Sequence, residues 1–396
     1  MKHSIVIPTA IQLCLDDVAW HNGRDERSLG KPSRSGLPRD HAPEDYRIIN
    51  ELGKAIDMKI LCPLCLGEWD KDNLLRGQVG ITFDPANWNR AALINYPLAE
   101  RYLEAAEQST HLEYAVHGLL HGNYDENGKQ LGEQEYFAPR KKEDGSYTKE
   151  RYPISMEDLK RRLDLFQAIY DSWGFQKKIR TIVSPGGVLP LPVEAFADFA
   201  EEFQSRGLVY WPNGWWQLKQ PMELLNGVAL LRECSSGRFA PWNGYDCDPS
   251  LFPDYDSEQT PLLPGVFGLH WTNFLRYHPQ NNMEYLPAWI QYFRRQSEIF
   301  GLLLSKDIAF AANQLAYACH AVLTFTEENG IKKCLVDVSV PKRLQRPHKK
   351  QEFYISFQNR LLPKECKDAS LELYETHQQF KTYRIRHEQD RLEIYL

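Results

Sequence analysis

Residues 112–125 read LEYAVHGLLHGNYD and place His117 and His121 directly after a short apolar run. The run itself, Leu112–Val116, is typical of a buried β-strand. On a helix, residues four positions apart share a face with Cβ atoms about 5–6 Å apart, so both imidazoles would reach a single cation. A pair of histidines at this spacing also arises by chance, so its interpretation depends on the segments around it.

The first apolar segment of the chain, residues 4–15, is rich in Ile, Val and Leu and is followed by Asp16 and Asp17. It predicts a buried strand that carries two carboxylates at its carboxyl end. In folds with parallel strands, ligands gather at that end of the sheet. Because adjacent residues of a strand point to opposite sides, the two carboxylates are able to do different work.

Apolar strand patterns alternate with helical patterns along most of the chain. We expect seven strands, within residues 4–15, 57–66, 112–116, 178–183, 208–211, 228–231 and 265–270. We expect helices at residues 43–56, 85–94, 97–107, 155–173, 196–206 and 286–304. The alternation predicts an α/β fold with a parallel sheet, and polar residues at several strand ends favour an irregular (β/α) barrel over an open sheet.

The pattern of the sequence changes near residue 318. Short alternating runs, separated by turn residues such as Asn329 and Gly330, replace the helical period. The chain is therefore predicted to divide into a barrel domain, residues 1–317, and a small all-β, sandwich-like domain, residues 318–396. We interpret the second domain as a structural lid or a contact in a homo-oligomer, with carbohydrate binding as the alternative.

The composition sets limits on partners and location. The chain has 396 residues, of which 42% are hydrophobic, and a formal net charge of −6, which provides no basic surface for nucleic acid. No run approaches the ~20 apolar residues of a membrane span, and the first residues lack the pattern of a signal peptide. We therefore expect a soluble cytoplasmic protein that binds neither nucleic acid nor membranes.

The eight cysteines are scattered over the chain without the density of a disulfide scaffold, so they are predicted to be reduced thiols. Cys62 and Cys65 have the spacing of half a zinc or redox site. The sequence has no second pair at a matching spacing, and these two cysteines continue an apolar run. A structural role is therefore predicted for both.

One aspartate at the end of the first strand can ligate a metal while its neighbour acts as a base. Together with His117 and His121 this makes a donor set suited to Zn²⁺ or a similar divalent ion. Such an ion lowers the pKa of a bound water toward ~7 and polarises a carbonyl oxygen. The pattern thus predicts hydrolysis of an amide or an ester.

These segments resemble motifs of the polysaccharide deacetylase family, the NodB-homology group. The family's Thr-Phe-Asp-Asp-Gly is similar to residues 14–18, Cys-Leu-Asp-Asp-Val, and its His-Ser/Thr-x-x-His is similar to residues 117–121, His-Gly-Leu-Leu-His. A late Leu-His motif is similar to Leu269 and His270. The order of the motifs extends the resemblance over residues 4–305 and implies the family's barrel fold.

The resemblance also implies roles for individual residues. Asp16 corresponds to the catalytic base, and His270 to the acid that protonates the leaving amine. The metal, expected to be Zn²⁺, would be held by Asp17, His117 and His121.

The family's arginine and proline motif is matched only in part. Residues 184–187, Ser-Pro-Gly-Gly, keep the proline and a glycine-rich turn, but Val183 stands where the family has its arginine. Arg232 or Arg238 would then have to orient Asp16. The predicted substrate-binding residues are Trp20, Pro185, Gly186, Trp215, Trp216 and Trp271.

The predicted function is that of a metal-dependent hydrolase which removes an N-acetyl group from an amino sugar or a glycan. One alternative is a deacetylase-like protein that binds a glycan without cleaving it, which the missing motif arginine favours and the intact aspartate and histidines count against. Another is a metal hydrolase that acts on an O-acetyl ester or a non-sugar amide, because the same activated water serves all three bonds.

Overall fold

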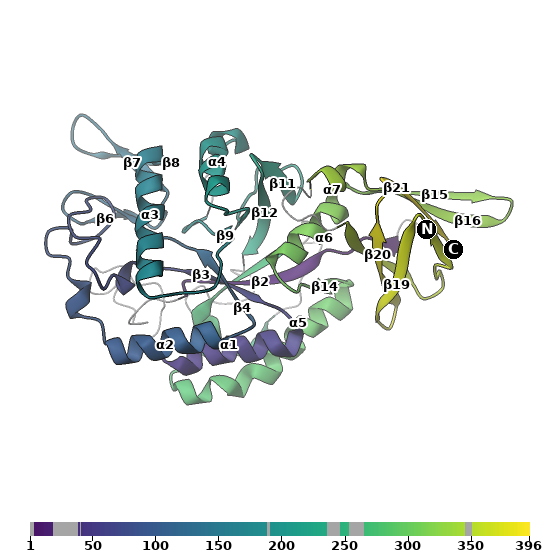
Figure 1. The fold of residues 1–396 in the computed structure, drawn as a ribbon, viewed down its shortest axis with the longest axis horizontal. Helices are drawn as coiled ribbons and strands as arrows, with labels where there is room; N and C mark the ends of the chain where they lie inside the picture. Colours follow the sequence, from purple (N-terminus) through teal and green to yellow (C-terminus); the bar gives the residue numbers. More distant parts are fainter. Residues whose placement is uncertain are drawn as a thin grey trace.

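Seven parallel strands form a closed barrel in the computed structural model (Figure 1). They are β2 (Ala10–Asp16), β3 (Ile60–Leu64), β4 (Leu112–Val116), β9 (Thr181–Ile182), β10 (Tyr210–Asn213), β12 (Val228–Ser235) and β13 (Val266–His270). Their order is β10, β9, β4, β3, β2, β13 and β12, and a parallel pairing of β12 with β10 closes the barrel. The predicted irregular (β/α) barrel is confirmed, and each predicted strand range overlaps one of these strands.

The structure describes residues 4–18, 39, 41–187, 191–235, 246–252, 265–344 and 351–396. Trp20 and Arg238, which the sequence analysis singles out, lie outside these ranges. Among the helices formed by the described residues, none has the length and apolar character needed to cross a membrane.

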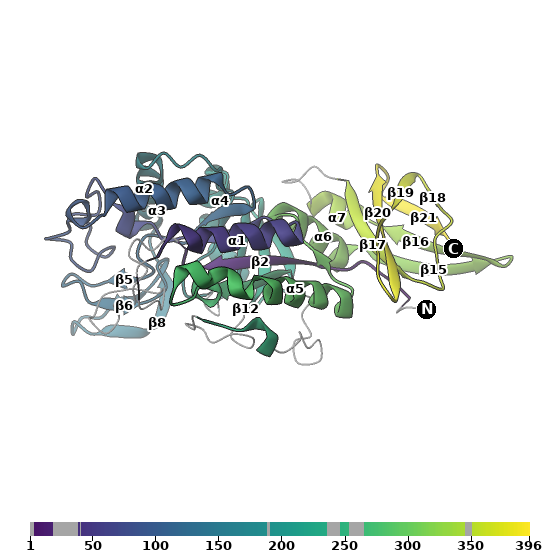
Figure 2. The same cartoon turned by 90° about the horizontal axis from the view of Figure 1, so that it is seen from below.

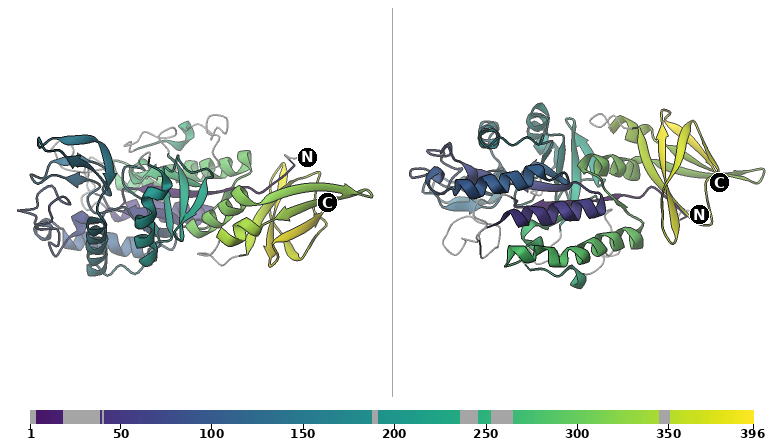
Figure 3. Two further views of the ribbon diagram at one scale, coloured as in Figure 1. Left: turned by 90° about the horizontal axis from the view of Figure 1, so that it is seen from above. Right: turned by 60° about the horizontal axis from the view of Figure 1, so that its bottom comes forward.

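Helices cover the outside of the barrel. They are α1 (Pro43–Ile56), α2 (Tyr96–Gln108), α3 (Met156–Ser172), α4 (Ala197–Ser205), α5 (Leu286–Phe300) and α6 (Ile308–His320). α1 lies beside both α2 and α5 on one side of the molecule (Figure 3). The start of α3 is as predicted, because the Ser155 side chain accepts a hydrogen bond of 3.1 Å from the backbone N–H of Asp158.

The helix predicted over residues 85–94 is wrong, since only the short 3-10 turn Arg90–Ala92 forms there. Trp88 accounts for the difference. Its indole N–H donates to Asp70 Oδ2 at 2.8 Å, and its backbone carbonyl accepts from Arg76 Nε at 2.9 Å. The carbonyl that a helix would need for its own ladder is therefore bound to a side chain from the preceding loop.

Helix α6 is not predicted by the sequence. It is buried on most sides, because it packs against β2 of the barrel and also against β17 (Glu352–Gln358) of the C-terminal part. A helix without a solvated face lacks the alternation of polar and apolar residues from which a helix is recognised. The predicted domain boundary between residues 317 and 318 falls within this helix.

Two additional four-stranded antiparallel sheets form at the C-terminus, in the orders β1-β17-β20-β19 and β15-β16-β21-β18. The other strands are β1 (Ile5–Val6), β15 (Val322–Glu328), β16 (Ile331–Asp337), β18 (Glu365–Lys367), β19 (Ala369–Thr376), β20 (Phe380–His387) and β21 (Arg391–Tyr395), with one short helix, α7 (Ser339–Leu344). β1 pairs with β17, whereas the next strand, β2, runs into the barrel (Figure 2). The first described strand thus joins a sheet whose other strands lie between residues 352 and 387.

The excursion between β4 and α3 forms two hairpins, β5 (Asn123–Tyr124) with β6 (Gln130–Gly132) and β7 (Phe137–Lys141) with β8 (Tyr147–Pro153). Figure 1 shows them at the end of the molecule opposite the C-terminal sheets. The remaining short elements are β11 (Met222–Leu225), β14 (Leu303–Leu304) and the 3-10 helices Gly67–Trp69, Val193–Phe196, Pro249–Leu251, Trp271–Phe274 and Pro279–Tyr285.

Candidate metal and catalytic site

The carboxyl ends of three barrel strands bring the residues of the predicted site together. β2 pairs in parallel with β13, and in that pairing Asp16 lies opposite His270. His117 follows β4, which lies two strands from β2 in the barrel order. Side chains far apart in the sequence therefore meet at one end of the barrel.

Asp17 faces three histidines at the centre of this cluster. Its Oδ1 lies 3.5 Å from Nε2 of both His117 and His121, and its Oδ2 lies 3.8 Å from Nε2 of His270. Asp17 is 2% exposed and has a φ of +65°, a left-handed conformation that aspartate adopts more readily than most residues. The structure thus joins one carboxylate and three imidazoles in one group, in which Asp17, His117 and His121 are buried and His270 is partly exposed.

His117 presents its Nε2 atom to Asp17 because the other ring nitrogen is already bound. Nδ1 lies 2.8 Å from the carbonyl oxygen of Val183, which can only accept, so Nδ1 carries the proton. Burial by itself lowers the pKa of His117, but the Asp17 carboxylate, together with the charge of Asp16, raises it to about 9. In the neutral ring, the Nε2 lone pair faces the centre of the cluster.

The Asp17 carboxylate has the properties expected of a metal ligand. Burial tends to raise its pKa, but the charges of His121, His117 and His270 reverse this effect and hold the pKa well below its usual range. Its buried Oδ1 atom makes no hydrogen bond with the described residues. Ligand atoms bound at about 2.0–2.1 Å around a tetrahedral Zn²⁺ stand about 3.4 Å apart, which is close to the two 3.5 Å separations observed here.

Cys65 adds another donor that the sequence analysis interpreted as structural. Ligand atoms of Asp17, Cys65 and His117 all lie within 4.8 Å of one another, and all three residues are buried. The Cys65 thiol donates to the carbonyl oxygen of His117 at 3.8 Å. Asp17 and His117 thus belong to two candidate donor sets. Cys65 completes the set whose ligand atoms all lie within 4.8 Å of one another, and His121, whose Nε2 lies 3.5 Å from Asp17 Oδ1, completes the set predicted from the sequence.

The segment from His117 to His121 is a bent loop, so the expectation that the pair sits on a helix is wrong. Gly118 has a φ of +93° and His121 a φ of +49°, and left-handed residues interrupt a helix. The two rings still face the same carboxylate oxygen, with centroids 5.1 Å apart. A buried carboxylate, Glu135, accepts hydrogen bonds from the backbone of this loop.

A cavity of 350 Å³ opens beside the cluster, and its lining includes Asp16, His117, His121 and His270. Burial raises the pKa of Asp16, an effect that the histidines offset in part. The Cys14 thiol donates to Asp16 Oδ1 at 3.4 Å. Asp16 thus faces the open space while its neighbour in the sequence faces the histidines.

Glu233, near the end of β12, is a second carboxyl in this cavity that the sequence analysis missed. Its side chain passes over Gly268 of the neighbouring strand, where any Cβ would collide with Glu233 Oε1. Burial and the adjacent Asp16 raise the pKa of Glu233 to about 8. One sequence signal was present, namely a glutamate inside the apolar segment Leu-Leu-Arg-Glu-Cys close to a strand end.

The predicted substrate-binding residues divide into two groups. Gly186 and Trp216 line the cavity, and Trp216 is 62% exposed. Trp215 and Trp271 lie instead in the hydrophobic core, where their indole N–H groups donate to backbone carbonyls. Pro185 is buried in the turn before Gly186. Of the predicted tryptophans that the structure describes, Trp216 therefore lines the cavity, whereas Trp215 and Trp271 are part of the core.

Arg232, one of the two arginines expected to orient Asp16, supports a different part of the molecule. Its Nε donates to the carbonyl of Trp215 at 3.0 Å, and its Nη2 donates to the carbonyl of Leu218. The guanidinium therefore holds the turn after β10. The residues that act most strongly on the Asp16 carboxyl, besides its burial, are His117 and His270.

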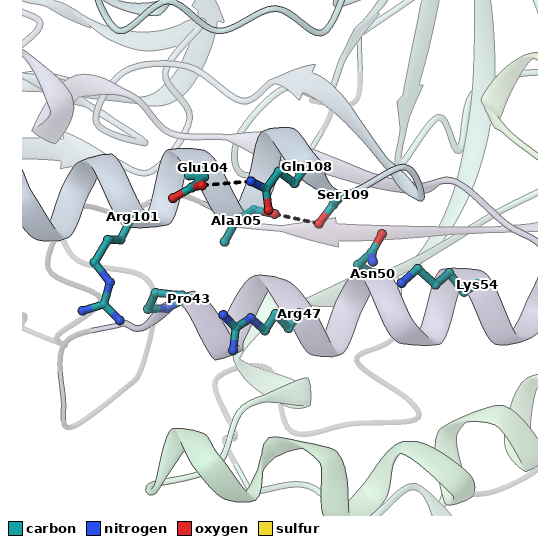
Figure 4. A pocket seen from close by; sticks show the side chains of 9 residues that line it. All are labelled: Pro43, Arg47, Asn50, Lys54, Arg101, Glu104, Ala105, Gln108 and Ser109. Carbon is teal, nitrogen blue, oxygen red and sulfur yellow. Dashed lines mark hydrogen bonds between the residues drawn. The ribbon is translucent and has the colours of Figure 1, made fainter.

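A second hollow of 340 Å³ lies between α1 and α2 on the outside of the barrel (Figure 4). It is lined by polar side chains that include Arg47, Lys54 and Arg101. Arg47 and Lys54 pair with glutamates one turn away on their own helix. Its lining contains neither histidine nor cysteine, and this groove is a solvated helix surface.

Comparison of the chain with protein-family models and with curated proteins finds no match. Among solved structures, the chain is similar to a CE4 family pseudoenzyme from Bacillus anthracis, with 13% identity, a TM-score of 0.34, and coverage of 76% of this chain and 66% of that one. A family 4 carbohydrate esterase from Streptomyces lividans in complex with acetate is 11% identical, with a TM-score of 0.31 and coverage of 75% of this chain and 92% of that one. A GH57-type branching enzyme from Pyrococcus horikoshii is 10% identical, with a TM-score of 0.37 and coverage of 76% of this chain and 69% of that one. These likenesses assign no residue roles.

Proposed function

We propose that the protein is a metal-dependent hydrolase that removes an N-acetyl group from an amino sugar or a glycan. The observation that supports this most is the pairing of β2 with β13, which sets Asp16 opposite His270 beside the buried Asp17. A carboxylate and an imidazole thus line one cavity next to a donor set that fits a cation. Amide hydrolysis requires such a base and such an acid.

The side chains that would hold the metal are Asp17, His117 and His121, and Cys65 lies close enough to join them. Three protein donors leave a Zn²⁺ ion an open position, as hydrolytic sites require. When bound, such an ion lowers the pKa of water and polarises a carbonyl oxygen. The Val183 carbonyl fixes the tautomer of His117 in which Nε2 is the donor atom.

Asp16 would accept the proton of the attacking water, for which it must be ionised. Its raised pKa brings the carboxyl closer to the pH at which a base accepts protons efficiently. His270, across the strand pairing, would give a proton to the departing nitrogen. Trp216 offers an exposed ring face at the cavity, and such faces pack against sugars.

We also propose that residues 318–396 form an accessory domain that contacts either a glycan or a second copy of the chain. Support for a surface role comes from half-exposed apolar side chains on its strands, among them Val322, Ile331 and Leu373. Support for a structural role comes from the pairing of β1 with β17, which joins this part to the start of the chain.

The proposal is tested by measuring bound metal and released acetate on the same purified protein. We expect about one Zn²⁺ per chain after dialysis, and acetate release from oligomers of N-acetylglucosamine. Metal without acetate from any N-acetylated or O-acetylated substrate would favour the glycan-binding alternative. Acetate from O-acetylated glycans alone would make the protein an esterase, and a chain that retains no metal would overturn the metal-dependent mechanism.

A further inference from the structure

We infer that Glu135 is a positioning residue that holds the loop from His117 to His121 in the shape needed to bind a metal. The inference rests on the proposed function insofar as these histidines are the ligands. Glu135 is itself no ligand, because its carboxylate is directed at the backbone of the loop. It belongs to the segment between β6 and β7, within the excursion from β4 to α3 that forms the two hairpins.

Three consecutive backbone N–H groups of the loop donate to the Glu135 carboxylate. Leu119 N lies 2.9 Å from Oε1 and 2.8 Å from Oε2, Leu120 N lies 3.1 Å from Oε2, and His121 N lies 3.0 Å from Oε2. Glu135 is fully buried, and both leucines are buried as well. Buried N–H groups without a partner are strongly unfavourable, so the loop depends on this carboxylate.

Gly118 shows that the loop and Glu135 are fitted to one another. Its φ of +93° favours glycine, and a Cβ at this position would collide with Glu135 Oε2. The carboxylate therefore occupies the space that any other residue would need. The glycine of the His-x-x-x-His segment is explained by this contact.

A buried arginine offsets the charge of Glu135. Arg162 Nη1 lies 3.6 Å from Glu135 Oε1, and Arg162 is buried too. Its Nη2 donates to Asn123 Oδ1 at 2.6 Å and to the Gly80 carbonyl at 2.8 Å. The guanidinium is thus anchored independently of the carboxylate, which allows it to fix where the carboxylate stands.

The position of the His121 ring follows from this arrangement. His121 donates its own backbone N–H to Glu135 and has a left-handed φ of +49°, which turns its side chain toward Asp17. His117 has a separate anchor in Val183, so the two ligands depend on Glu135 to different degrees. We expect the loss of Glu135 to displace His121 more than His117.

The neighbours of Glu135 connect the same segment to the rest of the site. Glu133 lines the cavity, and the Gln134 side chain donates to the carbonyl of Gly186 at 3.3 Å. Three successive residues thus contact the cavity, the glycine turn and the histidine loop. The insertion between β4 and α3 is therefore a supporting part of the site as well as its rim.

The test compares the affinity of Glu135→Gln and the wild-type protein for Zn²⁺ by competition with a chromophoric chelator. Partners that orient metal ligands typically contribute about 10–100-fold in affinity, and we expect a loss in this range. The visible spectrum of the Co²⁺-substituted protein should change as well, because the ligand geometry changes. Glu135→Asp keeps the negative charge on a shorter side chain, so its Zn²⁺ affinity should fall between those of the wild type and Glu135→Gln. The aspartate variant also provides the test if the glutamine variant does not fold.

The matched control is Asp45→Asn, which removes another buried carboxylate that pairs with an arginine, Arg39, at 2.9 Å and accepts a backbone N–H, that of Ala42, at 2.7 Å. It should lower the melting temperature without changing Zn²⁺ affinity or the Co²⁺ spectrum. If folded Glu135→Gln had the Zn²⁺ affinity and the Co²⁺ spectrum of the wild type, the inference would be overturned.

A measurement without metal separates this inference from the proposed function. The NMR signals of the histidine rings in the metal-free protein should move in Glu135→Gln, with His121 affected more than His117. Movement of these signals in a chain that binds no metal would support Glu135 and count against the proposed hydrolase. Unchanged signals, whether or not the wild type binds metal, would contradict the positioning role.

Discussion

The carboxyl end of the barrel and the C-terminal sheets use charged side chains in opposite ways. In the barrel, Asp17, His117 and Glu135 are buried and each meets specific partners. In the C-terminal sheets, pairs such as Glu372 with Arg384 lie on the strand surface, and the buried core is mostly apolar. Burying charge is unfavourable for folding, so its concentration around a cavity supports the proposed catalytic role of the barrel end, whereas the C-terminal sheets keep their charges on the surface and an apolar core inside.

The sharpest way to test this contrast is Asp16→Asn. Removing a general base typically lowers turnover by about 10²–10⁴-fold, and we expect a loss in this range with bound metal retained. Acetate release and metal content, measured on the same sample, check both parts. Full activity in this variant would show that Asp16 is not the base.

Replacing His117 by alanine should abolish stoichiometric metal binding, because His117 belongs to both donor sets. The loss should exceed the about 10–100-fold typical of residues that only orient ligands. His121→Ala and Cys65→Ser then decide between the two sets by the same chelator titration. We expect His121→Ala to lose more Zn²⁺ affinity than Cys65→Ser. In the wild type, His121 Nε2 lies 3.5 Å from Asp17 Oδ1, which is close to the separation of two ligand atoms on one Zn²⁺ ion. The reverse order would identify Cys65 as the third ligand.

Phe353→Ala tests the other region. The ring is fully buried between the C-terminal strands and α6, where it stacks on Tyr317 with centroids 4.6 Å apart. Truncation of such a residue costs about 3–5 kcal/mol, which should appear as a lower midpoint in urea unfolding. Zn²⁺ affinity of the folded variant should not change. A parallel loss of metal affinity would show that the two regions are coupled.

Glu233→Gln should stabilise the protein at alkaline pH. The pKa of Glu233 is raised from 4.5 to about 8, so the unfolded chain ionises this group first and stability falls as the pH rises from 4.5 to 8. Glutamine does not ionise, so we expect the free energy of unfolding of the variant to be higher than that of the wild type by on the order of 2 kcal/mol at pH 8. This difference should vanish near pH 4.5. Thermal unfolding of both proteins at the two pH values measures it, and an equal or lower stability of the variant at pH 8 would contradict the assignment.

The smallest effect is expected from Glu372→Gln in the C-terminal sheets. The exposed ion pair with Arg384 lowers the pKa of Glu372. The variant should therefore be slightly less stable than the wild type at neutral pH, and equally stable in acid, where Glu372 is protonated. This change in stability has the opposite sign to the change expected for Glu233→Gln. Equal behaviour of the two variants would remove the distinction between the regions.

The sequence predicted the barrel strands because each is a short apolar run between turns or helices, a local signal that tertiary contacts do not erase. It placed Asp16 and Asp17 at the ligand-binding end of the sheet because they follow an apolar strand, whereas His270 was predicted from the resemblance to the family's late Leu-His motif. It failed at residues 85–94, where Trp88 binds Asp70 and Arg76, and at α6, whose burial removes its periodicity. These failures share one cause, which is that side chains distant in sequence set the local structure.

By itself, the sequence determined the barrel, the antiparallel C-terminal part and the side chains that meet at the strand ends, because these depend on hydrophobic period and strand direction. The tertiary structure alone decided the loop shape of residues 117–121, the proximity of Cys65, the buried position of Trp215 and Trp271, and the presence of Glu233 in the cavity. Each of these depends on a contact across the fold, such as that of Glu135 with the loop, and only Glu233 left a local signal, as a glutamate near the end of an apolar strand.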